Sequence, residues 1–113
     1  MLFSGLTTTF LKEFAFDLWV TAPLFLSLAT VIAVLGQLVG KKEGWSRFDS
    51  FYWSFITATT VGYGDVRPTK TASRILAIVI ALVGLMLTGI LVAVAVHSAT
   101  VALAAHDAAT KAT

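Results

Sequence analysis

Two long apolar runs, separated by a region that contains glycines and charges, dominate the sequence. Residues 18–39 and residues 75–96 contain no charged side chain. At about 1.5 Å of rise per residue, a helix over either run is long enough to cross a hydrocarbon core of roughly 30 Å. We therefore predict an all-α membrane protein with an outer helix over residues 18–39 and an inner helix over residues 72–106.

Residues 1–17 precede the first run and place Leu2, Leu6, Phe10 and Phe14 at intervals of four. That spacing predicts a helix, which we assign as an N-terminal interfacial segment. The alternative is an extension of the outer helix, because few polar side chains define an opposite face. The segment has no basic start and no small-residue cleavage site, so we do not expect a cleaved signal peptide.

The region between the runs predicts a turn followed by a short helix. Gly40 to Gly44 combine glycines with charges, which is typical of a turn. Ser46 and Asp49 form an S-x-x-D capping box before a helix predicted over residues 47–59. That helix is too short to cross a membrane, so the chain must enter and return. Irregular backbone is stable at membrane depth only where protein buries it or water lines it, which indicates a pore.

The inner helix is longer than a hydrocarbon core requires, which predicts tilt, bending or an extension into the cytoplasm. The Ala-rich residues 107–113 are predicted to fray as a C-terminal tail. One membrane domain over residues 18–106 accounts for the rest of the chain.

Composition excludes several classes of protein. Hydrophobic residues make up 58% of the chain and charged residues 12%, more apolar surface than a small soluble core can hide. The net charge of +2 is too small to indicate nucleic-acid binding. Without cysteine, thiolate metal sites and cysteine nucleophiles are ruled out. The apolar runs hold no acid, base or nucleophile constellation, so we do not expect an enzyme. No helix carries Arg at every third position, so we do not expect a voltage sensor.

A motif with alternating glycines follows the short helix: Thr60-Val61-Gly62-Tyr63-Gly64-Asp65. The motif resembles the selectivity filter of potassium channels, above all bacterial two-transmembrane channels of the KcsA type. The resemblance implies two transmembrane helices, a re-entrant pore helix, a filter loop over residues 60–64 and a homotetramer. It also implies that permeant K⁺, with no other cofactor, binds the backbone carbonyls of Thr60, Val61, Gly62 and Tyr63 and the hydroxyl of Thr60.

The residue types suit that chemistry. A dehydrated potassium ion needs hard oxygen ligands, and backbone carbonyls supply them without fixed charge. Turning successive carbonyls toward one axis needs backbone conformations that L-residues resist, and Gly62 and Gly64 adopt them at low cost. One chain gives each ring of ligands a single carbonyl, and the resembled channels complete the ring with four-fold symmetry.

Aromatic side chains are placed to support the filter. Tyr52, Trp53 and Tyr63 can form a cuff behind it, with Trp53 donating its indole N–H to Asp65 as the resemblance implies. The alternative is a set of aromatics at the membrane interface. Ile56 stands where channels of the KcsA type have Glu, so we expect altered inactivation.

The inner helix carries the candidates for gating. Gly84 occupies the hinge position of the resembled channels and Gly89 is a second hinge candidate, with close helix packing as the alternative for both. Thr88 is placed to face a cavity. Val92 and Val96 are one helical turn apart and form either an apolar gate or a lipid-facing surface.

Ionisable residues near the helix ends give weaker signals. His97 and His106 are either pH sensors or solvated interfacial histidines, and no carboxylate is spaced to tune His97. Among the basic residues after the filter, Arg74 is our candidate for binding anionic membrane lipids, because it occupies a basic position of the resembled channels.

Charge placement conflicts with the resemblance over topology. Six of the eight Lys and Arg residues lie between the two apolar runs, which by the positive-inside rule would place that region in the cytoplasm. The resemblance implies a plasma-membrane channel with both termini cytoplasmic and the filter at the outer side. We follow the resemblance, because a short re-entrant region reports orientation poorly.

Three rival functions remain. A weakly selective cation channel is disfavoured because Val61 and Tyr63 are both present. A small proton-coupled multidrug transporter needs four spans and a membrane-embedded Glu, whereas Glu13 and Glu43 lie outside the apolar runs. A non-conducting assembly subunit leaves the alternating glycines unexplained.

Overall fold

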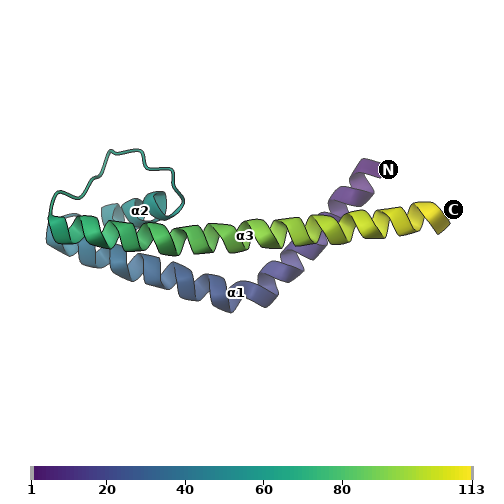
Figure 1. Cartoon of the computed structure of the whole chain (residues 1–113), viewed down its shortest axis with the longest axis horizontal. Coiled ribbons are helices and arrows are strands. Elements are labelled where there is room, and N and C mark those ends of the chain that lie inside the picture. The colour runs from purple at the N-terminus through teal and green to yellow at the C-terminus, as the bar shows by residue number, and fades with distance from the viewer. Residues whose placement is uncertain (1, 113) are drawn as a thin grey trace. The chain divides into compact units, whose positions relative to one another are not determined.

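The computed structural model describes residues 2–112 of the chain, and this part is all-α, as predicted. Helix α1 spans Leu2–Glu43, α2 spans Arg47–Ala58 and α3 spans Thr71–Ala112 (Figure 1). The chain divides into two compact units, one of residues 24–89 and the other of the residues up to 23 with those from 90 onward.

Helices α1 and α3 are both long and apolar enough to cross a membrane. Each has 42 residues, about 60 Å at 1.5 Å per residue, which is twice the roughly 30 Å of a hydrocarbon core. Each helix must therefore continue into the headgroup region or water. Helix α2 has 12 residues and is too short to cross.

Helix α1 is longer than the sequence predicted. Its first residues form one continuous helix with the outer-helix run, and Pro23 lies inside it without ending it. The turn predicted over residues 40–44 begins later, because α1 continues through Gly40 to Glu43. The helix stops at Gly44, whose φ of 77° is left-handed. The N–H of Trp45 then donates to the carbonyl of Gly40 at 2.9 Å, the closing hydrogen bond of a Schellman motif.

The ends of α2 and α3 follow local chemistry. The Ser46 side chain accepts the N–H of Asp49 at 3.1 Å, which confirms the predicted cap of α2. Helix α2 ends at Ala58 with Thr59 as its C-cap, one residue earlier than predicted. Helix α3 continues to Ala112, so residues 107–112 of the tail predicted to fray are helical, and residue 113 lies outside the described residues. Alanine is the strongest helix former, which explains the difference.

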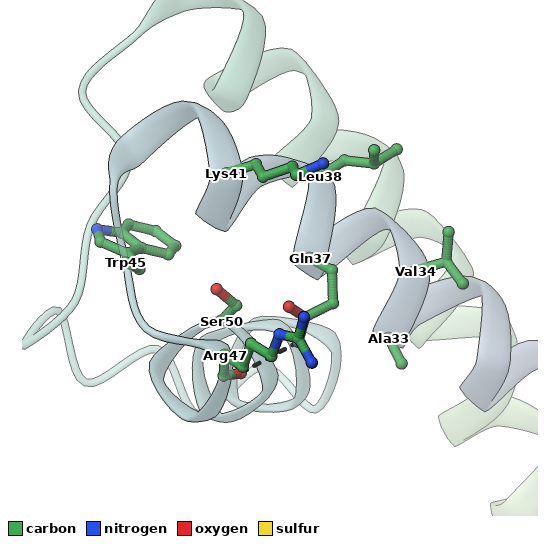
Figure 2. A pocket seen from close by; sticks show the side chains of 8 residues that line it. All are labelled: Ala33, Val34, Gln37, Leu38, Lys41, Trp45, Arg47 and Ser50. Carbon is green, nitrogen blue, oxygen red and sulfur yellow. Dashed lines mark hydrogen bonds between the residues drawn. The ribbon is translucent and has the colours of Figure 1, made fainter.

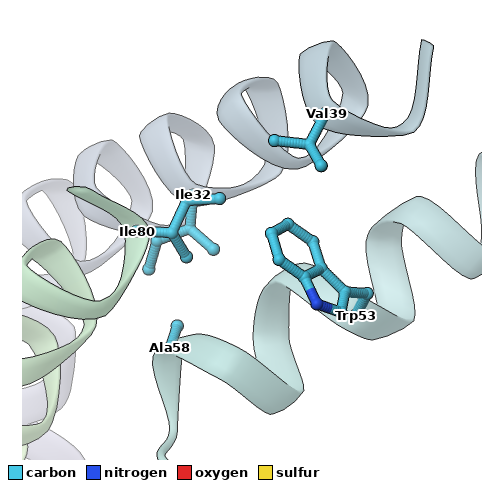
Figure 3. Packing of buried hydrophobic residues seen from close by; sticks show 5 residues of the cluster. All are labelled: Ile32, Val39, Trp53, Ala58 and Ile80. Carbon is cyan, nitrogen blue, oxygen red and sulfur yellow. The ribbon is translucent and has the colours of Figure 1, made fainter. Parts of the chain in front are cut away.

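The core of the unit formed by residues 24–89 joins all three helices. Ile32 and Val39 of α1 pack with Trp53 and Ala58 of α2 and with Ile80 of α3 (Figure 3). Because Trp53 in the middle of α2 and Ala58 at its C-terminal end both contribute, the second half of the short helix is fixed in place. The segment that follows it therefore starts from a defined position.

Small residues bring α1 and α2 into close contact. A Cβ atom at Gly36 would lie 2.4 Å from the Cβ of Ser54, and one at Gly40 would lie 1.7 Å from the Oγ of Ser50. The buried hydroxyls of Ser50 and Ser54 donate to carbonyls of their own helix, at 2.8 Å each, so neither is left unpaired. Such small-residue contacts are typical of membrane helices. The turn predicted at Gly40 is therefore wrong, and the four-residue spacing of small residues on both helices is the sequence signal for this packing.

Candidate ion-binding segment

The candidate site lies in the segment that connects α2 to α3, which turns back along α2 toward the start of α3 (Figure 1). Its first residues are anchored to the last turn of α2. The N–H groups of Val61 and Gly62 both donate to the carbonyl of Ile56, at 3.0 and 3.2 Å. The N–H of Thr60 donates to the carbonyl of Thr57 at 3.2 Å. The core contacts of α2 thus also position the start of the motif.

Left-handed backbone recurs at every second residue of the motif. Gly62 and Gly64 have φ values of 54° and 79°, which confirms that these glycines adopt conformations that L-residues resist. Thr60 has a φ of 65°, which the sequence did not predict, because this is costly for a β-branched residue. Its hydroxyl donates to the carbonyl of Thr59 at 2.6 Å. In an extended strand, successive carbonyls point to opposite sides. The left-handed backbone at alternate residues distinguishes this segment from such a strand.

Asp65 is held by Tyr52 and not by Trp53. The Tyr52 hydroxyl donates to Oδ2 of Asp65 at 3.0 Å. Trp53 is instead buried in the core and packs on Trp45, with ring centroids 5.2 Å apart. Neighbouring residues on a helix point about 100° apart, and although both aromatics line the space behind the motif, it is the Tyr52 hydroxyl that reaches Asp65. The sequence showed two adjacent aromatics but not which way α2 is turned, and our assignment of the hydrogen bond to Trp53 was wrong.

Behind the motif lies a small cavity of about 150 Å³, lined by residues of α2 and of the segment. Ile56, Tyr52 and Asp65 are among the lining residues. Ile56 brings an apolar side chain to a place where the resembled channels carry a carboxyl. The hydrogen bond between Tyr52 and Asp65 therefore links α2 to the far end of the motif, and no carboxyl at position 56 takes part.

Partial desolvation and the hydrogen bond to Asp65 raise the pKa of Tyr52 above its ordinary value of 10.0. A group with a raised pKa contributes its stabilisation below the unfolded-state pKa and loses it as pH rises through the folded value. The phenol thus remains a donor at neutral pH, and the contact is lost only in strong alkali.

We expect Tyr52→Phe to loosen residues 62–65 and to make steady currents decline severalfold faster, because the phenol no longer donates to Asp65. The measurement is the rate of current decline in planar bilayers at constant voltage. Asp65→Asn and the double variant complete a double-mutant cycle. Additive effects of the two substitutions would show that this hydrogen bond does not hold the segment.

Gly84 of α3 lies against the end of α2. A Cβ atom there would sit 2.1 Å from the carbonyl oxygen of Ala58 and 2.5 Å from its Cα atom. At Gly89 an added Cβ meets no atom within 4 Å among the described residues. Gly84 therefore has a packing requirement of its own, whereas a hinge at either glycine stays a prediction.

The remaining candidates of α3 lie apart from the motif. Val92 and Val96 are exposed in the single chain and Thr88 is half-buried, which suits both a pore-facing and a lipid-facing position. Their roles in a cavity or gate stay predictions. Arg74 lies in the first turn of α3 with its side chain exposed, and its N–H donates to the carbonyl of Lys70 at 3.0 Å.

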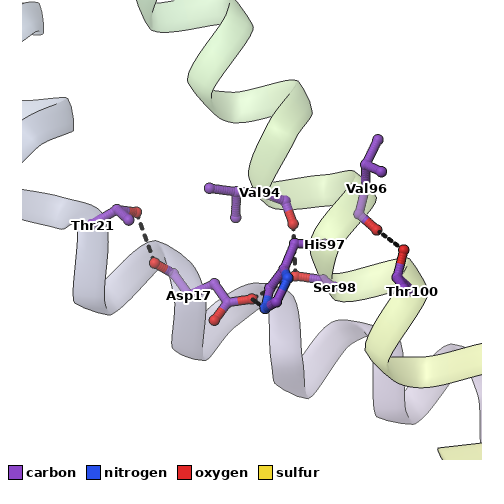
Figure 4. Close-up of polar contacts among 7 residues, drawn as sticks. All are labelled: Asp17, Thr21, Val94, Val96, His97, Ser98 and Thr100. Atoms are coloured by element: carbon purple, nitrogen blue, oxygen red, sulfur yellow. Dashed lines mark hydrogen bonds and ion pairs between the residues drawn. The ribbon is translucent and has the colours of Figure 1, made fainter. Parts of the chain in front are cut away.

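A carboxylate does lie near His97, contrary to the sequence-based expectation. In the unit that contains both chain ends, Nε2 of His97 is 4.0 Å from Oδ2 of Asp17. The buried Ser98 donates its hydroxyl to the same oxygen at 3.0 Å (Figure 4). Asp17 is on α1 and 80 positions away along the chain, so spacing within the inner helix could not reveal the pair.

The comparison with protein families matches residues 20–100 to the ion-channel family. This match covers α1 from residue 20 onward, all of α2, the motif and α3 as far as residue 100, and the chain belongs to that family. No solved structure matches the chain significantly.

Among curated proteins, the chain is similar to TWiK family of potassium channels protein 7 of Caenorhabditis elegans. The two are 46% identical over 69 residues, 58% of this chain and 12% of that protein. Two-pore potassium channel 1 of Arabidopsis thaliana is 38% identical over 68 residues, 58% of this chain and 18% of the relative. A voltage-gated potassium channel of Aeropyrum pernix is 45% identical over 40 residues, 35% of this chain and 14% of the relative. The chain thus spans less than a fifth of the length of these relatives.

Proposed function

We propose that this chain is the pore-forming subunit of a potassium-selective channel and that Thr60–Gly64 form its selectivity filter. The observation that carries the proposal is the left-handed backbone at Thr60, Gly62 and Gly64, in a segment anchored to the end of a short helix. Membership of the ion-channel family and relatives named as potassium channels support it.

The functional unit is a homotetramer with α2 as a re-entrant pore helix. One chain supplies a single carbonyl at each level of the filter, whereas an ion stripped of water needs a ring of them. Val61 and Tyr63 are 48% and 71% exposed in the single chain, and Phe48 of α2 is 73% exposed. Neighbouring subunits around a four-fold axis would cover these apolar side chains.

Conduction needs no energy source beyond the potassium gradient. An entering K⁺ ion exchanges its water for the carbonyls of Thr60, Val61, Gly62 and Tyr63, and neighbouring ions advance by mutual repulsion. The C-terminal end of α2 carries the negative end of a helix dipole, which favours a cation in the cavity by about 0.3–1 kcal/mol per helix. The dipole favours any cation, so selectivity rests on the filter.

The channel lies in the plasma membrane, with the filter at the outer side and both termini in the cytoplasm. Gly84 and Gly89 serve as hinge positions of α3, and Val92 and Val96 form the apolar gate below a cavity faced by Thr88. Arg74 contacts anionic lipid headgroups. In this topology the basic region between α1 and α3 faces outward, whereas the positive-inside rule would place it in the cytoplasm. A cysteine introduced at residue 44 tests the topology, because it should react with a membrane-impermeant reagent added from outside.

The test of the proposed function is the reversal potential of the purified channel in planar bilayers. A tenfold potassium gradient is balanced by an opposite sodium gradient. A potassium-selective filter predicts reversal about 59 mV from zero, at the potassium equilibrium potential. Reversal at zero would favour a weakly selective cation channel, and silence at every pH and lipid composition would favour a non-conducting assembly subunit.

A further inference from the structure

The unit formed by residues 24–89 also has a groove that no residue of the motif lines. It lies between the end of α1 and the start of α2 and has a volume of about 650 Å³ (Figure 2). Its size falls within the range of small-molecule sites. Its lining residues are Ala33, Val34, Gln37, Leu38, Lys41, Trp45, Arg47 and Ser50.

The two ends of this groove differ in chemistry. Ala33, Val34 and Leu38 belong to the uncharged run of α1 and form an apolar wall. Lys41 follows the end of that run, and Arg47 at the start of α2 supplies a second cation. The groove therefore crosses the level at which a membrane helix passes from hydrocarbon to headgroups.

The cations are free to bind an anion. No ion pair joins Lys41 or Arg47 to a carboxylate within residues 4–112, and both residues are exposed. None of the lining residues is acidic. Of the nearby acids, Glu43 accepts hydrogen bonds from the backbone of Thr69 and Lys70, and Asp49 does not line the groove.

The groove is held open by contacts of its own. The side-chain amide of Gln37 donates to the backbone carbonyl of Arg47 at 3.1 Å, which ties the start of α2 to α1 without engaging the guanidinium. The contact of Gly40 with Ser50 fixes the spacing of the two helices at the floor. The guanidinium of Arg47 and the ammonium of Lys41 thus line a preformed groove. A guanidinium group can bind a phosphate through two parallel hydrogen bonds.

We propose that this groove binds an anionic phospholipid, with its phosphate at Lys41 and Arg47 and the start of an acyl chain along Val34 and Leu38. A soluble phosphate would leave the apolar wall uncovered, and a neutral lipid would leave the two cations without a counter-ion. The site is distinct from Arg74, and it needs only that the chain lies in a membrane. Its failure is therefore separable from a failure of conduction.

The experiment is native mass spectrometry of the purified full chain in neutral detergent, titrated with dioleoylphosphatidylglycerol or dioleoylphosphatidylcholine. We expect the wild type to prefer the anionic lipid. The Lys41→Gln/Arg47→Gln variant should bind phosphatidylglycerol about tenfold more weakly, because two headgroup contacts are lost. The matched control, Lys12→Gln/Lys111→Gln, removes the same charge elsewhere and should bind like the wild type.

Two further arms keep the proposal falsifiable. The swap Lys41→Arg/Arg47→Lys retains both charges and should bind phosphatidylglycerol like the wild type, which separates loss of charge from poor folding of the neutralised variant. Inorganic phosphate and glycerol 3-phosphate should not displace the lipid. Equal binding of the two lipids by the wild type, displacement by either soluble phosphate, or equal loss in the control would overturn the proposal. So would loss of assembly in the neutralised variant without added lipid, because a second copy of the chain would then be the occupant.

Discussion

Gly62→Ala is expected to abolish potassium selectivity, moving the reversal potential under opposed potassium and sodium gradients from the potassium equilibrium value to near zero. Gly62 has a φ of 54°, and an added Cβ meets no atom within 4 Å in the described chain. The effect therefore comes from the backbone, because an L-residue resists left-handed geometry by about 1–2 kcal/mol. In the proposed homotetramer, a rotated peptide unit at this position would turn a carbonyl away from the pore axis in all four subunits at once.

The control for this prediction is Gly44→Ala. Gly44 has a φ of 77° and also has no atom within 4 Å of an added Cβ, but it ends α1 and lies outside the motif. The two variants impose a similar backbone cost at different places. Gly44→Ala should keep the wild-type reversal potential. If both variants lose selectivity, or neither does, residues 60–64 are not the filter.

Gly84→Ala is expected to lower the stability of the folded channel by about 1–3 kcal/mol, the usual cost of overpacking. Alanine in place of a helical glycine contributes about 0.5–1 kcal/mol in the opposite direction. The clash prevails because the new Cβ would lie 2.1 Å from a backbone carbonyl oxygen of Ala58, which no side-chain rotation can relieve. Thermal unfolding followed by circular dichroism in detergent measures the change.

Gly89→Ala is the matched control, on the same helix with no atom within 4 Å of the new Cβ. It should leave the unfolding temperature unchanged or raise it. The proposed hinge role of Gly84 is tested separately, by the open probability of Gly84→Ala channels in planar bilayers. Equal unfolding temperatures for Gly84→Ala and the wild type would refute the packing role.

Much of the architecture is encoded locally and could be read from the sequence. Two uncharged runs require helices long enough to cross a membrane, and Ser46 with Asp49 marks the start of a helix too short to do so. The alternation of Gly62 and Gly64 indicates a backbone that visits left-handed geometry. Each of these properties depends on residues within one helical turn or one motif, so neighbours in sequence suffice to determine them.

Other features depend on how one helix is turned against another. The rotation of α2 decided that Tyr52 and not Trp53 bonds Asp65. The sequence predicts a turn at Gly40, whereas in the structure Gly40 lies inside α1 and packs against Ser50 of α2. The pairing of distant segments of α1 and α3 gave His97 its carboxylate neighbour.

The sequence by itself therefore determined the class of the protein, its helices and the motif with alternating glycines that we propose as the filter. Only the tertiary structure decided which side chains meet across helices, including the cations that share a groove with the apolar wall of α1. The physical reason is that hydropathy, capping and glycine geometry act over a few residues, whereas a contact between helices depends on their rotation and separation. Those are set by the packing of small side chains across the interface, as at Gly36 and Gly40.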